Sequence, residues 1–203
     1  MGATIKDVES CLASLEMKHW REQETIVMSF ETEHFTDLDP ETARGHVLLT
    51  WIVVQENGGV LEIVAPKILL AEGEHREAVL AACMSLSWNM NFVKFSLDTN
   101  DNEIRASICV SLLEVTLTPS MLRRALVNLV ENVDLAFPSL VLARDTGVLQ
   151  LPSCPLPPDL KALSGVLSGL SSEQLAALRR LSPLQLAALK NGLAGDSSVE
   201  VVL

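Results

Sequence analysis

The chain has 203 residues, of which 48% are hydrophobic, and its 26 acidic and 15 basic side chains give a formal net charge of −11. The apolar fraction excludes a chain that is disordered throughout, and the negative charge argues against nucleic acid as a partner. The sequence contains neither an uninterrupted apolar run of about 18 residues nor a signal-peptide pattern near Met1. These features predict a cytoplasmic protein that does not span a membrane.

The first elements predicted in chain order are a helix and a strand. Residues 4–16 have apolar side chains at helical spacing, and Thr4 with Asp7 matches a capping box. Residues 24–32 alternate between apolar and polar side chains, which predicts a half-buried antiparallel strand. The connector 31–43 carries five acidic residues before Arg44. We expect it to be a solvated face or a weak docking patch rather than a calcium loop.

A hairpin is predicted next. Residues 46–55 are nearly all apolar, which favours a central strand covered on both faces. The sequence Asn57-Gly58-Gly59 is typical of a hairpin turn, since these residues tolerate positive φ. The following strand is predicted at 60–65, and we expect Pro66 to stop it because proline has no backbone N–H for the ladder.

The rest of the first domain is predicted to be helix, two strands and helix. Residues 73–90 carry an apolar helical stripe, and strands are predicted at 92–97 and 103–117 with a polar loop between them. Thr118-Pro119 is a typical helix start, and Pro138 is expected to kink that helix or to end it. The predicted fold class is therefore α+β, with an antiparallel five-stranded sheet and the order α-β-β-β-α-β-β-α.

The composition changes after this unit. We predict one domain over residues 1–147, a proline-rich linker over 148–158 and a helical tail with a disordered end over 159–203. In the tail, the pattern of 170–178 recurs at 181–189. Short helices do not persist alone in water, so their leucines must pack on the first domain, on a second copy or on a partner protein. The candidate partner-binding residues are Leu175, Leu178, Leu186 and Leu189.

No motif in the sequence indicates catalysis, a cofactor or a metal site. The four cysteines have no CxxC spacing and the four histidines have no metal-ligand spacing. We expect Cys83 and Cys109 to be buried thiols. The three tryptophans, Trp20, Trp51 and Trp88, are expected to be packing residues rather than a ligand cage.

The element order resembles that of the YbjN family, whose fold is similar to that of type III secretion chaperones. The resemblance covers residues 3–145 and depends on five stretches, 75–90, 91–97, 108–112, 118–122 and 133–138. In the last of these the family's aromatic pair before proline is reduced to Phe137. The resemblance implies an α+β domain that is often paired as a dimer and that binds or regulates without turnover. It supplies no catalytic residues.

Three functional hypotheses remain open at this point. The first is a non-enzymatic adaptor or chaperone-like protein that works as a homodimer with an unidentified protein partner. The second is a regulator that senses a small ligand in a pocket between sheet and helices. The third is an enzyme of an unrecognised type.

Overall fold

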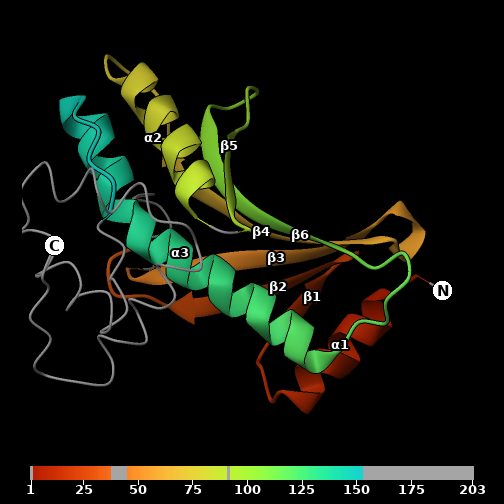
Figure 1. Ribbon diagram of the computed structural model, residues 1–203. Helices are drawn as coiled ribbons and strands as arrows, with labels where there is room; N and C mark the ends of the chain where they lie inside the picture. The colour runs from red at the N-terminus through yellow and green to blue at the C-terminus, as the bar shows by residue number, and fades with distance from the viewer. Residues whose placement is uncertain (1, 38–44, 91, 153–203) are drawn as a thin grey trace, which may run out of the picture. The chain divides into compact units, whose positions relative to one another are not determined.

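The computed structural model describes residues 2–37, 45–90 and 92–152 (Figure 1). The elements run α1 (Ile5–Ser14), β1 (Trp20–Glu22), β2 (Thr25–Glu31), β3 (Val47–Gln55), η1 (Glu56–Gly58), β4 (Val60–Leu70), α2 (Arg76–Asn89), β5 (Lys94–Leu97), β6 (Glu103–Ser111) and α3 (Pro119–Thr146). The α+β class is confirmed. The predicted count of five strands is wrong, because β1 has only three residues and these are too few to produce an alternating pattern.

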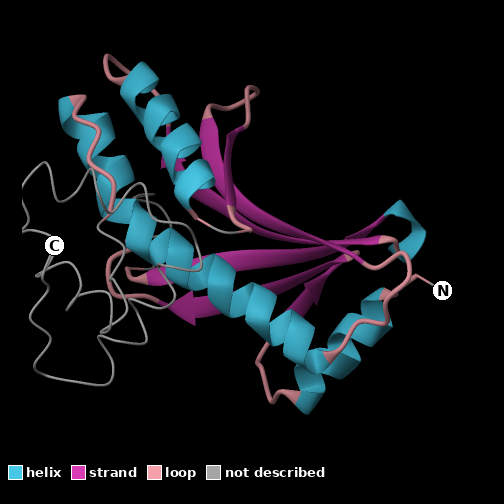
Figure 2. Cartoon of the chain, viewed as in Figure 1, coloured by secondary structure: helices cyan, strands magenta, loops and turns pink. Residues whose placement is uncertain are grey.

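The described strands form one antiparallel sheet in the order β1-β2-β3-β4-β6-β5. Figure 2 shows the helices gathered against one face of this sheet. The long helix α3 crosses that face and contacts β4 and β6, while α1 and α2 each contact α3. The helices and the inner face of the sheet enclose the core, whose largest fully buried side chains include Ile52, Leu61, Ile63, Ile104 and Leu122.

Helices α1 and α3 begin as the sequence predicts. Thr4 and Asp7 form the capping box of α1, in which the Asp7 carboxylate accepts the Thr4 backbone N–H at 2.7 Å. The Thr118 hydroxyl accepts the Met121 N–H at the start of α3, with Pro119 in the first turn. Pro138 does not end α3, which continues to Thr146. Pro138 is exposed and has no N–H to donate to the carbonyl of Asp134, four residues earlier, yet the helix continues through it.

The turn between β3 and β4 is a hairpin, as predicted, and its backbone is left-handed at three successive residues. Glu56, Asn57 and Gly58 have φ values of 49°, 53° and 90°. The Gly58 carbonyl accepts the Ala3 N–H at 2.9 Å, so the N-terminal segment packs directly on this turn. A Cβ at Gly58 would lie 2.3 Å from the Ala3 carbonyl oxygen. Glycine is therefore required here both by the backbone angle and by the close approach.

The prediction that Pro66 stops the third predicted strand is wrong. Strand β4 runs on to Leu70, and its pairing with β6 shifts register between Ala65 and Leu69. Pro66 lies inside this bulge, where the ladder is already interrupted, so its missing N–H removes no ladder bond. The next N–H, that of Lys67, donates to the Glu103 carboxylate at 2.8 Å. The Glu103 side chain, 36 positions away in the sequence, thus accepts a hydrogen bond from a backbone N–H that the bulge leaves without a ladder partner.

The central position of β3 is confirmed, but the expectation that both of its faces are covered is not met by the described residues. Leu48, Thr50 and Ile52 point into the core and are fully buried or nearly so, whereas Trp51 on the other face is 40% exposed. The difference arises because α1, α2 and α3 all pack on the same face (Figure 2). The opposite side, called here the outer face, meets no helix of the described part of the chain.

Two predicted segments are shorter in the structure. The helix predicted at 73–90 begins at Arg76, and the strand predicted at 103–117 ends at Ser111. Ser111 is the last β6 residue with a partner in β4. After it, the Leu112 N–H makes one further bond in the same register, to the Gly59 carbonyl, and the predicted strand residues 113–117 lie beyond the ladder.

Candidate functional site

The four tail leucines proposed as partner-binding residues, Leu175, Leu178, Leu186 and Leu189, lie outside the described residues, as do Cys154 and residues 38–43 of the acidic connector. The described beginning of that connector is tied to α3. Its N–H groups at Glu33, His34 and Phe35 donate to the Asp134 carboxylate at 3.1, 2.8 and 2.7 Å. Burial alone would raise the pKa of Asp134, but these donors outweigh it and lower the pKa. The group that binds this part of the connector is therefore the Asp134 carboxylate of α3.

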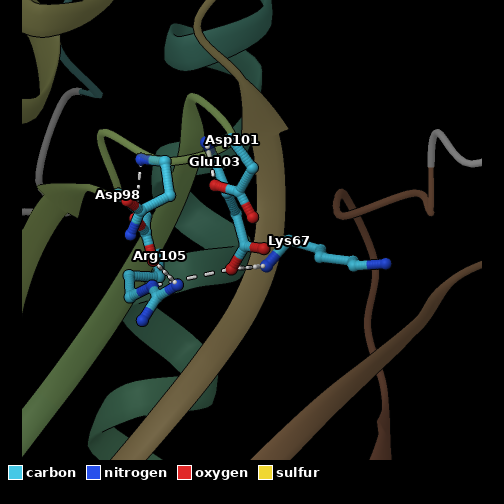
Figure 3. Close-up of polar contacts among 6 residues, drawn as sticks. Lys67, Asp98, Asp101, Glu103 and Arg105 are labelled. Carbon is cyan, nitrogen blue, oxygen red and sulfur yellow. Dashed lines mark hydrogen bonds and ion pairs between the residues drawn. The ribbon is translucent and has the colours of Figure 1, made fainter.

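The charged residues that interact most closely form a structural cluster at one end of the sheet (Figure 3). The Arg105 guanidinium binds the Asp98 carboxylate and lies 3.6 Å from that of Glu103. Glu103 is buried and also accepts the Lys67 N–H of the β4 bulge. Asp101 accepts the Glu103 N–H at 3.0 Å. These contacts join the β5–β6 hairpin to the bulge, so their role is to hold three backbone segments together.

The thiols differ from one another in exposure. Cys83 is buried as expected, and burial raises its pKa to about 12. The expectation for Cys109 is wrong, since this residue is exposed. Its neighbours in β6, Ile108 and Val110, are apolar, but Cys109 occupies the alternate position that points to the outer face. Among the described residues, no group of three or more His, Cys, Asp or Glu side chains is placed to hold a metal ion.

The three tryptophans, expected to be packing residues rather than a ligand cage, are all exposed to some extent. Two of them lie in one cross-strand row on the outer face, in which Val27 pairs with both Trp20 and Trp51, and Trp51 pairs with Val64. Val27 is only 2% exposed although no described helix covers it. Trp20 and Trp51 flank it on either side and account for this shielding.

The apolar part of the outer face is called here the tryptophan face. By strand register it consists of Trp20, Val27, Val47, Leu49, Trp51, Val53, Val60 and Val64. Three acidic residues at outer-face positions of the same strands surround it, namely Glu22, Glu31 and Glu62. The Trp20 indole N–H donates to the Glu22 carboxylate at 2.7 Å, so one acid is bound directly to the aromatic surface. No Lys or Arg occupies an outer-face position of β1, β2 or β3, or of β4 before its bulge.

A second exposed apolar surface runs along α2. Met84 and Trp88 are separated by four residues, hence lie on one side of the helix, and Phe92 follows shortly after the helix ends. These three residues, called here the α2 stripe, are 76%, 89% and 72% exposed. Residues 78–93 contain no Asp, Glu, Lys or Arg. The stripe is therefore a charge-free surface on an otherwise acidic chain.

Helix α2 also closes one edge of the sheet. The Ser87 hydroxyl accepts the Phe95 N–H at 2.8 Å and lies 3.3 Å from the Phe95 carbonyl oxygen. It thereby satisfies backbone groups of the edge strand β5 that β6 does not pair. The other edge strand, β1, has only three residues. Neither edge offers a long open backbone for a partner strand, so the faces are the better candidates for contact.

Helix α3 has the length and the hydropathy that a membrane-crossing helix needs. In this structure, however, ten of its residues are buried against the rest of the described chain, including Leu122, Leu126, Leu129 and Val133. Its apolar character is thus used in the core of the domain.

Comparison with solved structures finds the same fold elsewhere. The chain matches the crystal structure of YbjN, a proposed transcription regulator from E. coli, with a TM-score of 0.52 and 11% sequence identity over 69% of this chain and 91% of that one. It also matches a chain of the HopA1-SchA chaperone-effector complex, with a TM-score of 0.42 and 15% identity over 63% of this chain and 88% of that one. No family model matches the sequence, and no curated protein matches it. The chain has a YbjN-like fold, as the resemblance implied.

Proposed function

We propose that this protein is a non-enzymatic, chaperone-like adaptor that binds other proteins and acts as a cytoplasmic homodimer, without a cofactor, nucleic acid or membrane as a partner. The observation that carries the proposal is the α2 stripe. Met84 and Trp88 place large apolar side chains almost fully in solvent, and exposed apolar surface of this kind marks protein contacts.

The charge distribution supports a second copy as the partner of the α2 stripe. Residues 1–145 contain 22 acidic and 11 basic side chains, so 11 − 22 gives a net charge of −11. Two such domains repel each other wherever their acids approach. A contact through α2 avoids this repulsion, because residues 78–93 carry no charge. A two-fold axis beside Trp88 would bury the same stripe on both copies.

The backbone at Phe92 adds a second argument. Its φ of 71° lies in the left-handed region, which bulky side chains rarely adopt. The phenyl ring of this residue is 72% exposed, which is unfavourable in an isolated chain. Strain that persists at an exposed apolar residue supports a role in contact.

Light scattering tests the dimer directly. The full chain at micromolar concentration should give about twice its mass of 22.1 kDa. Met84→Ser combined with Trp88→Ser should shift the mass to that of one chain, with an unchanged circular dichroism spectrum. Trp20→Ser is the matched control, since it removes an exposed tryptophan from the outer face and should leave the dimer intact. A wild-type mass near 22.1 kDa would contradict the homodimer.

The alternative is a ligand-sensing regulator with a pocket between sheet and helices, and YbjN is itself proposed to regulate transcription. It has less support, because the described space between sheet and helices is occupied by buried side chains such as Ile63, Leu126 and Leu129. Purification of the protein from its own cell would show whether a protein accompanies it. A rise in melting temperature with a small metabolite and no copurifying protein would favour the alternative.

A further inference from the structure

From the chemistry of the tryptophan face we infer that it binds a basic amphipathic segment of a partner protein, in which lysine or arginine side chains flank apolar ones. The inference rests on the proposed protein-binding role and names the class of partner. It concerns a different surface from the α2 stripe, so the two can be tested separately.

The partner segment is expected to carry apolar side chains because of the cross-strand row centred on Trp51. Trp20 and Trp51 are 43% and 40% exposed and stand on either side of the shielded Val27. Rings fixed in this way present a broad, ordered apolar surface that loses little conformational entropy on binding. Tryptophan is also among the residues that contribute most to protein contacts.

The partner segment is expected to carry lysine or arginine because acidic side chains surround these rings. Glu22 is hydrogen-bonded to the Trp20 indole, and Glu62 pairs with Val53, two residues along the same two strands from the Trp51–Val64 pair and so on the same face. A cation placed beside them is attracted both by the carboxylates and by the π-face of the tryptophans. The basic outer-face residues Lys94 and Arg105 lie at the far end of the sheet on β5 and β6, and Arg105 is already bound to Asp98.

The same charges argue against a second copy as the occupant. Face-to-face packing of two tryptophan faces would bring the acids Glu22, Glu31 and Glu62 of one copy close to those of the other. Like charges opposed in a desolvated contact are unfavourable. The α2 stripe has no such charges, so self-association and partner binding are assigned to different surfaces.

Fluorescence titration of the full-length protein tests the inference with three synthetic probes. These are a short amphipathic peptide of leucine and lysine, the same peptide with glutamate in place of lysine, and a lysine-serine peptide of equal charge. The leucine-lysine peptide should bind at least about tenfold more tightly than either of the others. Its affinity should fall as salt is raised.

Variants locate the binding on the surface. Trp51→Ser should weaken binding of the leucine-lysine peptide by about tenfold or more. Glu22→Gln with Glu62→Gln should weaken peptide binding and reduce its dependence on salt. Because Glu22 is exposed and Glu62 is half-buried, this variant still tests the proposal if Trp51→Ser does not fold. Val127→Ser with Glu131→Gln is the matched control, since both residues are exposed on α3 and belong neither to the tryptophan face nor to the α2 stripe, and this variant should bind the peptide as the wild type does.

Three kinds of result would overturn the inference. Equal binding of the glutamate peptide, or unchanged binding by both outer-face variants, would show that the tryptophan face does not select basic segments. A loss of dimer mass in Trp51→Ser would make a second copy the occupant. If the peptide binds only to a variant in which the four tail leucines are replaced by serine, the chain's own tail is the segment that occupies the tryptophan face. If the dimer test fails while peptide binding holds, the homodimer is wrong and this inference stands.

Discussion

The Asp134 carboxylate accepts the backbone N–H of Phe35 at 2.7 Å, across 99 positions of sequence. The same two segments also meet through their rings, since Phe35 and Phe137 pack edge to face with centroids 4.9 Å apart. Helix α3 thereby holds the chain as it leaves β2 and enters the acidic connector. One turn of α3 provides both the polar contact and the apolar one.

Asp134→Asn should destabilise the fold by about 1–2 kcal/mol, because a neutral amide replaces a charged acceptor of three N–H donors. The pKa of Asp134 is lowered in the folded state. The stabilisation is therefore complete above the unfolded pKa of about 3.9 and is lost as pH falls through the lower folded value. Urea unfolding of wild type and variant measures this. A difference that persists at a pH below both values would contradict the assignment to ionised Asp134.

Gly58→Ala should lower the melting temperature, since its Cβ would meet the Ala3 carbonyl oxygen at 2.3 Å and its φ is 90°. We expect a loss of about 1–3 kcal/mol. Gly45→Ala is the control, because it also has positive φ but no atom within 4 Å of the added Cβ. If both variants lose the same stability, the close approach of Ala3 contributes nothing.

Thr50→Val should stabilise the domain by about 1 kcal/mol. The Thr50 side chain is fully buried in β3, and its hydroxyl has no hydrogen-bond partner among the described residues. Valine has nearly the same shape and removes the cost of burying an unpaired hydroxyl. Thermal melting measures the change, and a lower melting temperature would show that the hydroxyl is paired in solution, for example with water.

Truncation after Thr146 should leave a cooperative melting transition, because every described helix and strand ends by that residue. The linker and tail predicted after residue 147 are then dispensable for folding of the first domain. Calorimetry of the truncated chain against the full chain makes the comparison. An insoluble or molten product would show that the tail completes the core.

Replacement of Leu175, Leu178, Leu186 and Leu189 by serine should weaken the binding of partner proteins, as the loss of a contact additional to the tryptophan face, without changing the melting temperature of the first domain. Leucines at helical spacing in a tail whose four acidic and four basic residues give zero net charge fit recognition of a helix in a groove. Mass spectrometry of the proteins that accompany wild type and variant from the same cells tests this. If the partners remain and the melting temperature falls, the tail is a structural element and the prediction is wrong.

Local patterns in the sequence were sufficient for most elements of the fold. The capping box of Thr4 and Asp7 depends on atoms three residues apart, and the start of α3 depends on Thr118 and its neighbours. The alternation of Ile104, Ala106 and Ile108 identifies the buried side of β6. Such signals need no knowledge of distant residues, and a sequence therefore carries them completely.

The tertiary structure decided which apolar residues became core and which became surface. Pro66 does not end its strand, because Glu103 from another strand satisfies the Lys67 N–H inside the bulge. Trp51 and Cys109 lie in apolar strands yet face outward, because all the described helices pack on the other side of the sheet. Periodicity tells which residues share a face of a strand, but the face that becomes buried depends on where distant helices pack. The tryptophan face, assembled from four strands, could therefore be recognised only once their register was known.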